Sequence, residues 1–255
     1  MKKILLSTMT IALVVVAGIG ASRAFFSDVE TSTGNTFTAG ELDLKVDNTC
    51  HYWTDANADD QYVDVGCPTT SSWTLTDLGA EHKFFDFADI KPGDYGEDTI
   101  SLHVDNDAWL RLVIDGLNND DVSCTEPEEE VEGAGCGGIG NGSGELRQNL
   151  LFTMWLDQGV TLGFQGPQDL SECDNDHVSE FEPTIIFEGP IDPGGEIWDL
   201  ANYPGFPYLL ADQTACFGVA WTLPSTVGNE VQSDSFVGNM TFNVEQHRNN
   251  PTPFD

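Results

Sequence analysis

Basic residues are scarce in this chain. Of 255 residues only 9 are Lys or Arg, against 43 Asp or Glu, which gives a formal net charge of −34. Nucleic-acid binding needs clustered basic side chains to neutralise phosphates, so this composition excludes nucleic acid as a partner. Because 40% of the residues are hydrophobic and 10% are aromatic, the chain has enough apolar side chains for a folded core, which argues against disorder.

The sequence also lacks the short motifs of common hydrolases. It contains no H-E-x-x-H zinc motif, no C-x-x-C pair and no G-x-S-x-G nucleophile motif. No catalytic residue is therefore assigned, and we expect a protein that is not an enzyme.

Long apolar runs are missing except at the N-terminus. Lys2 and Lys3 precede the uncharged, mostly apolar residues 4–21, and small residues occupy the −3 and −1 positions before a cleavage position between Ala24 and Phe25. This pattern is typical of a secretory signal peptide over residues 1–24. A retained membrane anchor is the alternative, because the run is just long enough to span a bilayer. With cleavage, the chain contacts the membrane only before processing, and residues 25–255 form one secreted, extracellular or cell-surface domain.

Cleavage would make the chain more acidic. It removes three basic residues and no acid, which takes the formal charge from −34 to −37. Such a surface repels itself at low salt. The composition therefore favours a salt-rich, halophilic setting or an exterior rich in divalent cations.

The cysteine count is even, which favours disulfides in an exported chain. Many connectivities remain possible, and free buried thiols are the alternative. We favour two local pairs, because each closes a polar loop, and the third pair is the remainder. The pairs are Cys50–Cys67, Cys124–Cys136 and Cys173–Cys216.

Short alternating or apolar runs recur between clusters of Gly, Pro, Asn and Asp, and no long helical periodicity is visible. These features predict an all-β fold: a jelly-roll-like antiparallel β-sandwich with long loop insertions, after an N-terminal signal-peptide helix. A Lys-Pro-Gly-Asp sequence at residues 91–94 predicts a turn. The predicted strands fall at residues 41–46, 72–76, 84–87, 99–104, 109–114, 150–156, 184–187, 216–223 and 240–244, of which 150–156 is also compatible with a helix.

Two regions differ from this strand pattern. Residues 116–146, at their most distinctive in the acidic and Gly-rich stretch 118–144, predict a long surface insertion. Residues 163–183 form a second irregular region. We expect neither to be a separate domain.

Oxygen-bearing side chains alternate at Asp55, Asn57 and Asp59, which resembles the start of a Ca²⁺-binding loop. The sixth position is Asp60 and the twelfth is Gly66, where a complete loop has Gly and Glu. A solvated acidic turn is the alternative. The acidic run 128–132 is a further candidate for Ca²⁺, so the cofactor prediction is none, with Ca²⁺ left open.

Three sequence elements resemble the TasA/camelysin family of secreted proteins, over most of residues 1–115 and again at 215–250. One is the turn at residues 91–94, and another is the pair Phe26 and Asp28 just after the cleavage position. The third is an alternating segment with Phe37, Gly40, Leu42, Asp43 and Leu44.

The resemblance implies a jelly-roll subunit whose signal peptide is cut by a dedicated signal peptidase of the SipW type. It also implies self-association into biofilm matrix fibres, in which an N-terminal segment adds a strand to the next subunit. Here residues 25–37 would be the donor strand, with apolar anchors at Phe25, Phe26, Val29 and Phe37. The alternative is that this segment is the first strand of its own sheet.

Two other functions stay open. Some relatives are described as camelysin metalloproteases of the cell surface, although this chain has no zinc motif. A Ca²⁺-dependent adhesion module is the other possibility, because acidic side chains are abundant.

Overall fold

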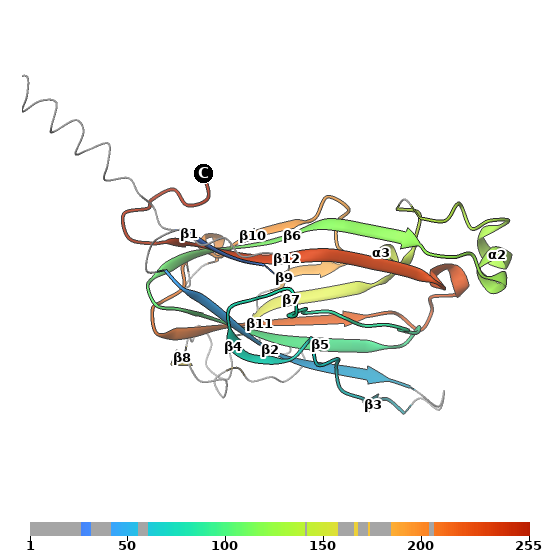
Figure 1. Ribbon diagram of the computed structural model, residues 1–255, viewed down its shortest axis with the longest axis horizontal. Helices are drawn as coiled ribbons and strands as arrows, with labels where there is room; N and C mark the ends of the chain where they lie inside the picture. The colour runs from blue at the N-terminus through green and yellow to red at the C-terminus, as the bar shows by residue number, and fades with distance from the viewer. Residues whose placement is uncertain are drawn as a thin grey trace, which may run out of the picture.

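The computed structural model describes residues 27–31, 42–55, 61–140, 142–157, 166–167, 173, 185–203 and 207–255. Within them the chain forms two antiparallel sheets that lie face to face (Figure 1). The helices among these residues are short. The prediction of an all-β, sandwich-like fold is therefore confirmed.

The smaller sheet has four strands, in the order β1-β12-β6-β10. Its two central strands, β6 and β12, are long and pair with each other over most of their length. The outer strands are short and each has one neighbour. The strands are β1 (Ser27–Thr31), β6 (Ala108–Asp121), β10 (Glu196–Asp199) and β12 (Asp234–Gln246).

The larger sheet has eight strands, with the main order β3-β2-β5-β11-β7-β9, while β4 pairs with β2 and β8 with β11. Here β5 and β11 lie in the centre. The strands are β2 (Leu44–Thr54), β3 (Val63–Asp64), β4 (Trp73–Thr76), β5 (Tyr95–Val104), β7 (Leu151–Asp157), β8 (Gly166–Pro167), β9 (Ile185–Gly189) and β11 (Gln213–Thr222).

Alternate side chains of both sheets fill the space between them. Phe217 of β11 and Phe242 of β12 are fully buried, and their ring centroids lie 6.0 Å apart across the core. Leu44 at the start of β2 belongs to the same cluster. Each such side chain contributes about 1.5–3 kcal/mol through burial. The period-two alternation seen in the sequence is thus what turns one face of each strand inward.

A β-bulge divides the β6–β12 pair into two parts. The register shifts between Val237 and Asn239, opposite Gly116, whose φ of +60° a residue with a side chain rarely adopts. Before the bulge, β6 covers the core. Beyond it, Leu117 and Phe236 still pack against the core, and the two strands continue to the pair formed by Asp121 and Asp234.

The predicted insertion at residues 116–146 is partly wrong. Its first residues continue β6 as far as Asp121, because β12 extends far enough to supply a hydrogen-bonded partner. The rest holds α2 (Glu126–Glu132) and runs into α3 (Leu146–Asn149). Two 3₁₀ turns lie later, at Leu200–Asn202 and Asn229–Val231.

One predicted strand is wrong. Residues 84–87 form a loop whose aromatic side chains close the core. Phe84 is buried with its ring centroid 5.9 Å from that of Phe242, and Phe85 contacts Phe152 at 5.8 Å. Apolar side chains on consecutive positions reach two sheets at once, so the run indicated burial and not a strand.

The other predicted runs overlap strands. Residues 150–156, where a helix was also compatible, lie largely in β7, and the run at 41–46 enters β2 at Leu44. The remaining runs coincide with parts of β4, β5, β6, β9, β11 and β12.

The turn at residues 91–94 is confirmed. The N–H of Lys91 donates to the Asp94 carboxylate at 2.8 Å, and Gly93 has a φ of +101°. The N–H of Leu223, at the end of β11, donates to the Asp94 carbonyl at 2.9 Å. Pro, Gly and Asp thus act here through backbone geometry and local hydrogen bonding.

Candidate functional site

The strand β1 lies at an open edge of the smaller sheet (Figure 1). It pairs antiparallel with β12, from Ser27 opposite Glu245 to Thr31 opposite Thr241. This pairing corresponds to the alternative that residues 25–37 serve their own sheet. In the single chain, β1 therefore fills the edge position beside β12.

The register of this pair places acidic residues of β1 opposite buried apolar residues of β12. Asp28 and Glu30 lie opposite Val244 and Phe242, which are fully buried, and Val29 lies opposite Asn243. Directly opposite residues of an antiparallel pair share a face. The register thus pairs the two acidic residues with core residues of β12, and the apolar residue with a polar one.

The outer face of the smaller sheet is covered by the C-terminal residues. Arg111 of β6 donates two hydrogen bonds to Asp199 of β10, at 2.5 and 3.0 Å, and its guanidinium carbon lies 4.6 Å from the ring centroid of Phe254. The indole N–H of Trp109 donates to the Asn250 carbonyl at 2.8 Å. These contacts hold the C-terminus beside the β12 residues that pair with β1.

Most residues predicted for the N-terminal function lie outside the described part of the chain. These are the cleavage residues Ala24 and Phe25 and the anchors Phe26 and Phe37. Val29 lies within β1. Of the predicted Ca²⁺ loop, Asp55 follows β2, whereas Asn57 and Asp59 fall outside the described residues.

All three favoured disulfides are present: Cys50–Cys67, Cys124–Cys136 and Cys173–Cys216. No cysteine is free. The first joins β2 to the loop after β3, the second spans α2, and the third joins β11 to the predicted irregular region at residues 163–183. Each disulfide therefore anchors a loop on or beside the sheets.

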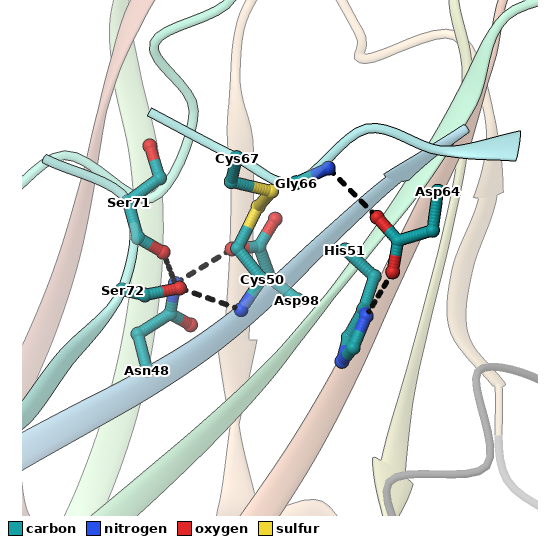
Figure 2. The surroundings of a disulfide bond; sticks show 9 residues. All are labelled: Asn48, Cys50, His51, Asp64, Gly66, Cys67, Ser71, Ser72 and Asp98. Carbon is teal, nitrogen blue, oxygen red and sulfur yellow. Dashed lines mark hydrogen bonds and ion pairs between the residues drawn. A yellow bond between two sulfur atoms is a disulfide. The ribbon is translucent and has the colours of Figure 1, made fainter. Parts of the chain in front are cut away.

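The surroundings of Cys50–Cys67 include a buried polar contact on the inner side of β2 (Figure 2). The Asn48 amide donates to the Ser71 carbonyl at 2.8 Å and to the Asp98 carboxylate at 2.6 Å. Burial, with a smaller contribution from Glu97, raises the pKa of Asp98 well above its ordinary value, while the Asn48 hydrogen bond opposes the rise. On the other side of the strand, His51 lies 3.0 Å from Asp64.

The described histidines each have a local partner. His51 and His103 contact Asp64 and Asp47, both at 3.0 Å, and His82 accepts from the Gly79 N–H at 2.8 Å. The His247 ring stacks on Tyr208 at 3.8 Å. Among the residues that the structure describes, the one cluster with metal-ligand side chains contains no histidine.

That cluster includes residues that sequence reasoning missed. Asp121 and Glu128 are buried at the end of the β6–β12 pair, close to Glu145 and Asp234. Glu128 belongs to the acidic run considered for Ca²⁺, but its exposed neighbours look identical in sequence. Only the pairing of β6 with β12 brings Asp234 to the other three, and no local sequence signal marks that contact.

The fold and its covalent links define the class of this protein: a disulfide-linked, antiparallel β-sandwich with an edge strand at its N-terminus. No described helix is long and apolar enough to cross a membrane. No family model, curated protein or solved structure matches the chain. The resemblance to the TasA/camelysin family therefore rests on the sequence motifs alone.

Proposed function

We propose that this protein is an extracellular structural subunit that polymerises head to tail. The N-terminal segment of one subunit leaves its own sheet and adds a strand beside β12 of the next. The observation that carries this proposal is the register of β1, which has one neighbour and puts Asp28 and Glu30 opposite buried core positions.

A shift of one residue would exchange the two faces of this strand. In the shifted register, Phe25 and Val29 take the core-side positions, and Asp28 and Glu30 face outward. A strand supplied by a neighbouring subunit is free to adopt that register, because it is not tied to the body it binds. Exchange would therefore replace a mismatched edge with a matched one.

Chain length between β1 and β2 permits exchange. Twelve residues separate Thr31 from Leu44, and an extended chain of that length spans about 40 Å. Donor and acceptor surfaces differ, so each addition leaves a new acceptor at one end and a new donor at the other. The product is an open filament.

The three disulfides support a place outside the cytosol, since structural disulfides persist in oxidising compartments. In the proposed processing, a signal peptidase of the SipW type cuts after Ala24. The mature chain then carries Phe25 at its N-terminus and assembles in the extracellular matrix or at the cell surface.

Deletion of residues 25–34 from the mature chain tests the proposal. We expect a folded monomer that forms no filaments by negative-stain electron microscopy. A synthetic peptide of residues 25–37 should bind this truncated subunit, whereas the same peptide carrying Phe25→Asp and Val29→Asp should not. Normal polymerisation of the deletion variant would contradict the proposal.

Point variants test the register separately. Val29→Asp should abolish filaments and change monomer stability by no more than about 0.5 kcal/mol, because position 29 lies opposite Asn243 in the single chain. The control is Ser32→Asp, which adds the same charge at a position that would face outward in the shifted register, as Asp28 and Glu30 would. Equal loss of filaments in both variants would indicate a charge effect and contradict the proposed register.

A further inference from the structure

Four carboxylate side chains gather where β6 ends and β12 begins. Asp121, the last residue of β6, lies directly opposite Asp234, the first residue of β12. Glu128 comes from α2, and Glu145 immediately precedes α3. Like charges directly opposite each other on paired strands are destabilising. This arrangement therefore needs a compensating interaction.

Two of the four carboxylates, those of Asp121 and Glu128, are buried, and all four are only partly hydrogen-bonded. Asp121 is 1% exposed and Glu128 is 0% exposed. The Thr125 N–H and the Ser233 O–H both donate to the same oxygen of Glu128, each at 3.1 Å. The other oxygen of Glu128 is buried without a hydrogen-bond partner.

The remaining members show the same deficit. The backbone N–H of Ser123 lies near the Asp121 carboxylate, but neither oxygen of Asp121 accepts a hydrogen bond of normal geometry. Glu145 and Asp234 each have one buried oxygen without a hydrogen-bond partner. The other oxygen of Asp234 accepts from the N–H groups of Glu145 and Leu146, at 2.6 and 2.8 Å. Buried carboxylate oxygens require a donor or a cation.

Among the described residues, no basic side chain supplies that partner. The ion pairs in this part of the chain involve other acids, and none includes a member of this cluster. Instead the acids lie close to one another, with Glu145 near Glu132 and Asp234, and Asp234 near Glu128 and Asp121.

The chemistry of the possible ligand atoms determines which kind of cation the site would bind. One oxygen each of Asp121 and Glu128 and the sulfur of Cys136 all lie within 4.8 Å of one another. Because Cys136 is bonded to Cys124, its sulfur is not a thiolate and is a poor metal ligand. The ligands are therefore carboxylate oxygens, which suit Ca²⁺ with its six to eight oxygen ligands and flexible geometry.

We propose that the buried carboxylates of Asp121 and Glu128 bind one Ca²⁺ ion, and that the neighbouring Glu145 and Asp234 turn toward it as further ligands. The ion would join α2 and the segment before α3 to the ends of β6 and β12. Figure 1 shows α2 beyond one end of the sandwich and β1 near the other. The site is therefore separate from the proposed strand exchange, and either proposal can fail without the other.

Thermal unfolding of the secreted, disulfide-intact protein tests the site. After treatment with a chelator, the protein is melted with CaCl₂, with MgCl₂, or with KCl at matched ionic strength. At a Ca²⁺ concentration about a hundred times Kd, we expect Tm to rise by about 5–10 °C above the KCl value. Mg²⁺ should give a smaller rise. Equal rises in CaCl₂ and KCl would show screening alone and overturn the proposal.

Variants that each remove one negative charge separate the site from general acidity. Asp121→Asn and Glu128→Gln should each remove the Ca²⁺-specific rise, and should raise Tm in chelator because repulsion decreases. The controls Glu129→Gln and Glu130→Gln remove the same charge from exposed positions of α2 and should keep the rise. Equal losses in the controls would contradict the proposal.

Binding stoichiometry gives a readout that does not depend on the variants folding. Equilibrium dialysis in about 1 M KCl, where weak surface binding is screened, should give one tightly bound Ca²⁺ per wild-type chain. No tightly bound ion under these conditions would overturn the proposal.

Discussion

Asp98 is a carboxyl group inside the core, on the inner side of β5. Its side chain is fully buried, and one of its oxygens has no hydrogen-bonding partner. The other oxygen accepts from Asn48, which is itself held by the Ser71 carbonyl. Because burial raises the pKa of Asp98, its ionised form is the one that the folded state disfavours.

The raised pKa determines the direction in which the Asp98 carboxyl changes the free energy of unfolding with pH. A carboxyl with a raised folded-state pKa contributes no penalty below its unfolded pKa, where it is protonated in both states. The penalty grows as pH rises from there through the folded-state pKa. Asp98→Asn mimics the protonated form and should be about 1–3 kcal/mol more stable than the wild type at pH 8. The two proteins should converge near pH 4.

Urea unfolding of both proteins across this pH range measures the difference. Other acids titrate in both proteins, so only the change in the difference reports on Asp98. A difference that is constant with pH, or one that grows toward low pH, would contradict the assignment.

At the scale of elements, the disulfides fasten the irregular parts of the chain. Cys50–Cys67 and Cys124–Cys136 close loops with sequence separations of 17 and 12, whereas Cys173–Cys216 closes one with a separation of 43. A cross-link limits the unfolded chain more when its loop is longer. The three should therefore contribute unequally.

Replacing each pair by two serines tests this order. Loss of Cys173–Cys216 should cost about 4 kcal/mol, and loss of either local pair about 3 kcal/mol, by the loop-entropy relation. Urea unfolding of the three double variants measures the costs. A larger cost for a local pair would show that native packing around that pair outweighs loop entropy.

The Cys124–Cys136 variant is informative in a second way. This disulfide spans α2, which carries Glu128. If its loss also weakens Ca²⁺ binding, the disulfide helps to hold the carboxylates in place.

At the scale of the whole molecule, charge would oppose the proposed assembly. Removal of residues 1–24 would change the formal charge from −34 to −37. Subunits of this charge would repel each other before a donor strand could reach its acceptor. The Debye length falls from about 10 Å at 0.1 M salt to about 3 Å at 1 M.

Filament formation should therefore rise steeply with monovalent salt. Light scattering and electron microscopy between about 0.05 M and 1 M NaCl measure it, with sucrose of equal osmolality as the control. The Asp121→Asn variant should show the same dependence, because Asp121 is the last residue of β6 and Figure 1 shows that end of β6 away from β1. Filament yield that is independent of NaCl would contradict this electrostatic account.

Much of the fold could be predicted from local patterns. Alternation places Leu44 and Val46 in the core and leaves Lys45 half-exposed between them, and the turn at residues 91–94 follows from its Pro, Gly and Asp. The disulfides followed from spacing and from the need to close loops. The prediction of a strand at residues 84–87 was wrong. An apolar run indicates that side chains are buried, but it does not indicate whether the backbone pairs with a neighbouring strand.

The sequence by itself determined the composition of the surface, the inward face of most strands and the three cysteine pairs. These depend on charge count, on a period of two residues, and on short separations for two of the cysteine pairs, the third pair being the remainder. Only the tertiary structure decided the register of β1 and the meeting of Asp121 with Asp234. Both are pairings with β12, more than a hundred residues away in sequence. No local pattern encodes which distant strand a segment will pair with, since that choice minimises the free energy of the whole sheet.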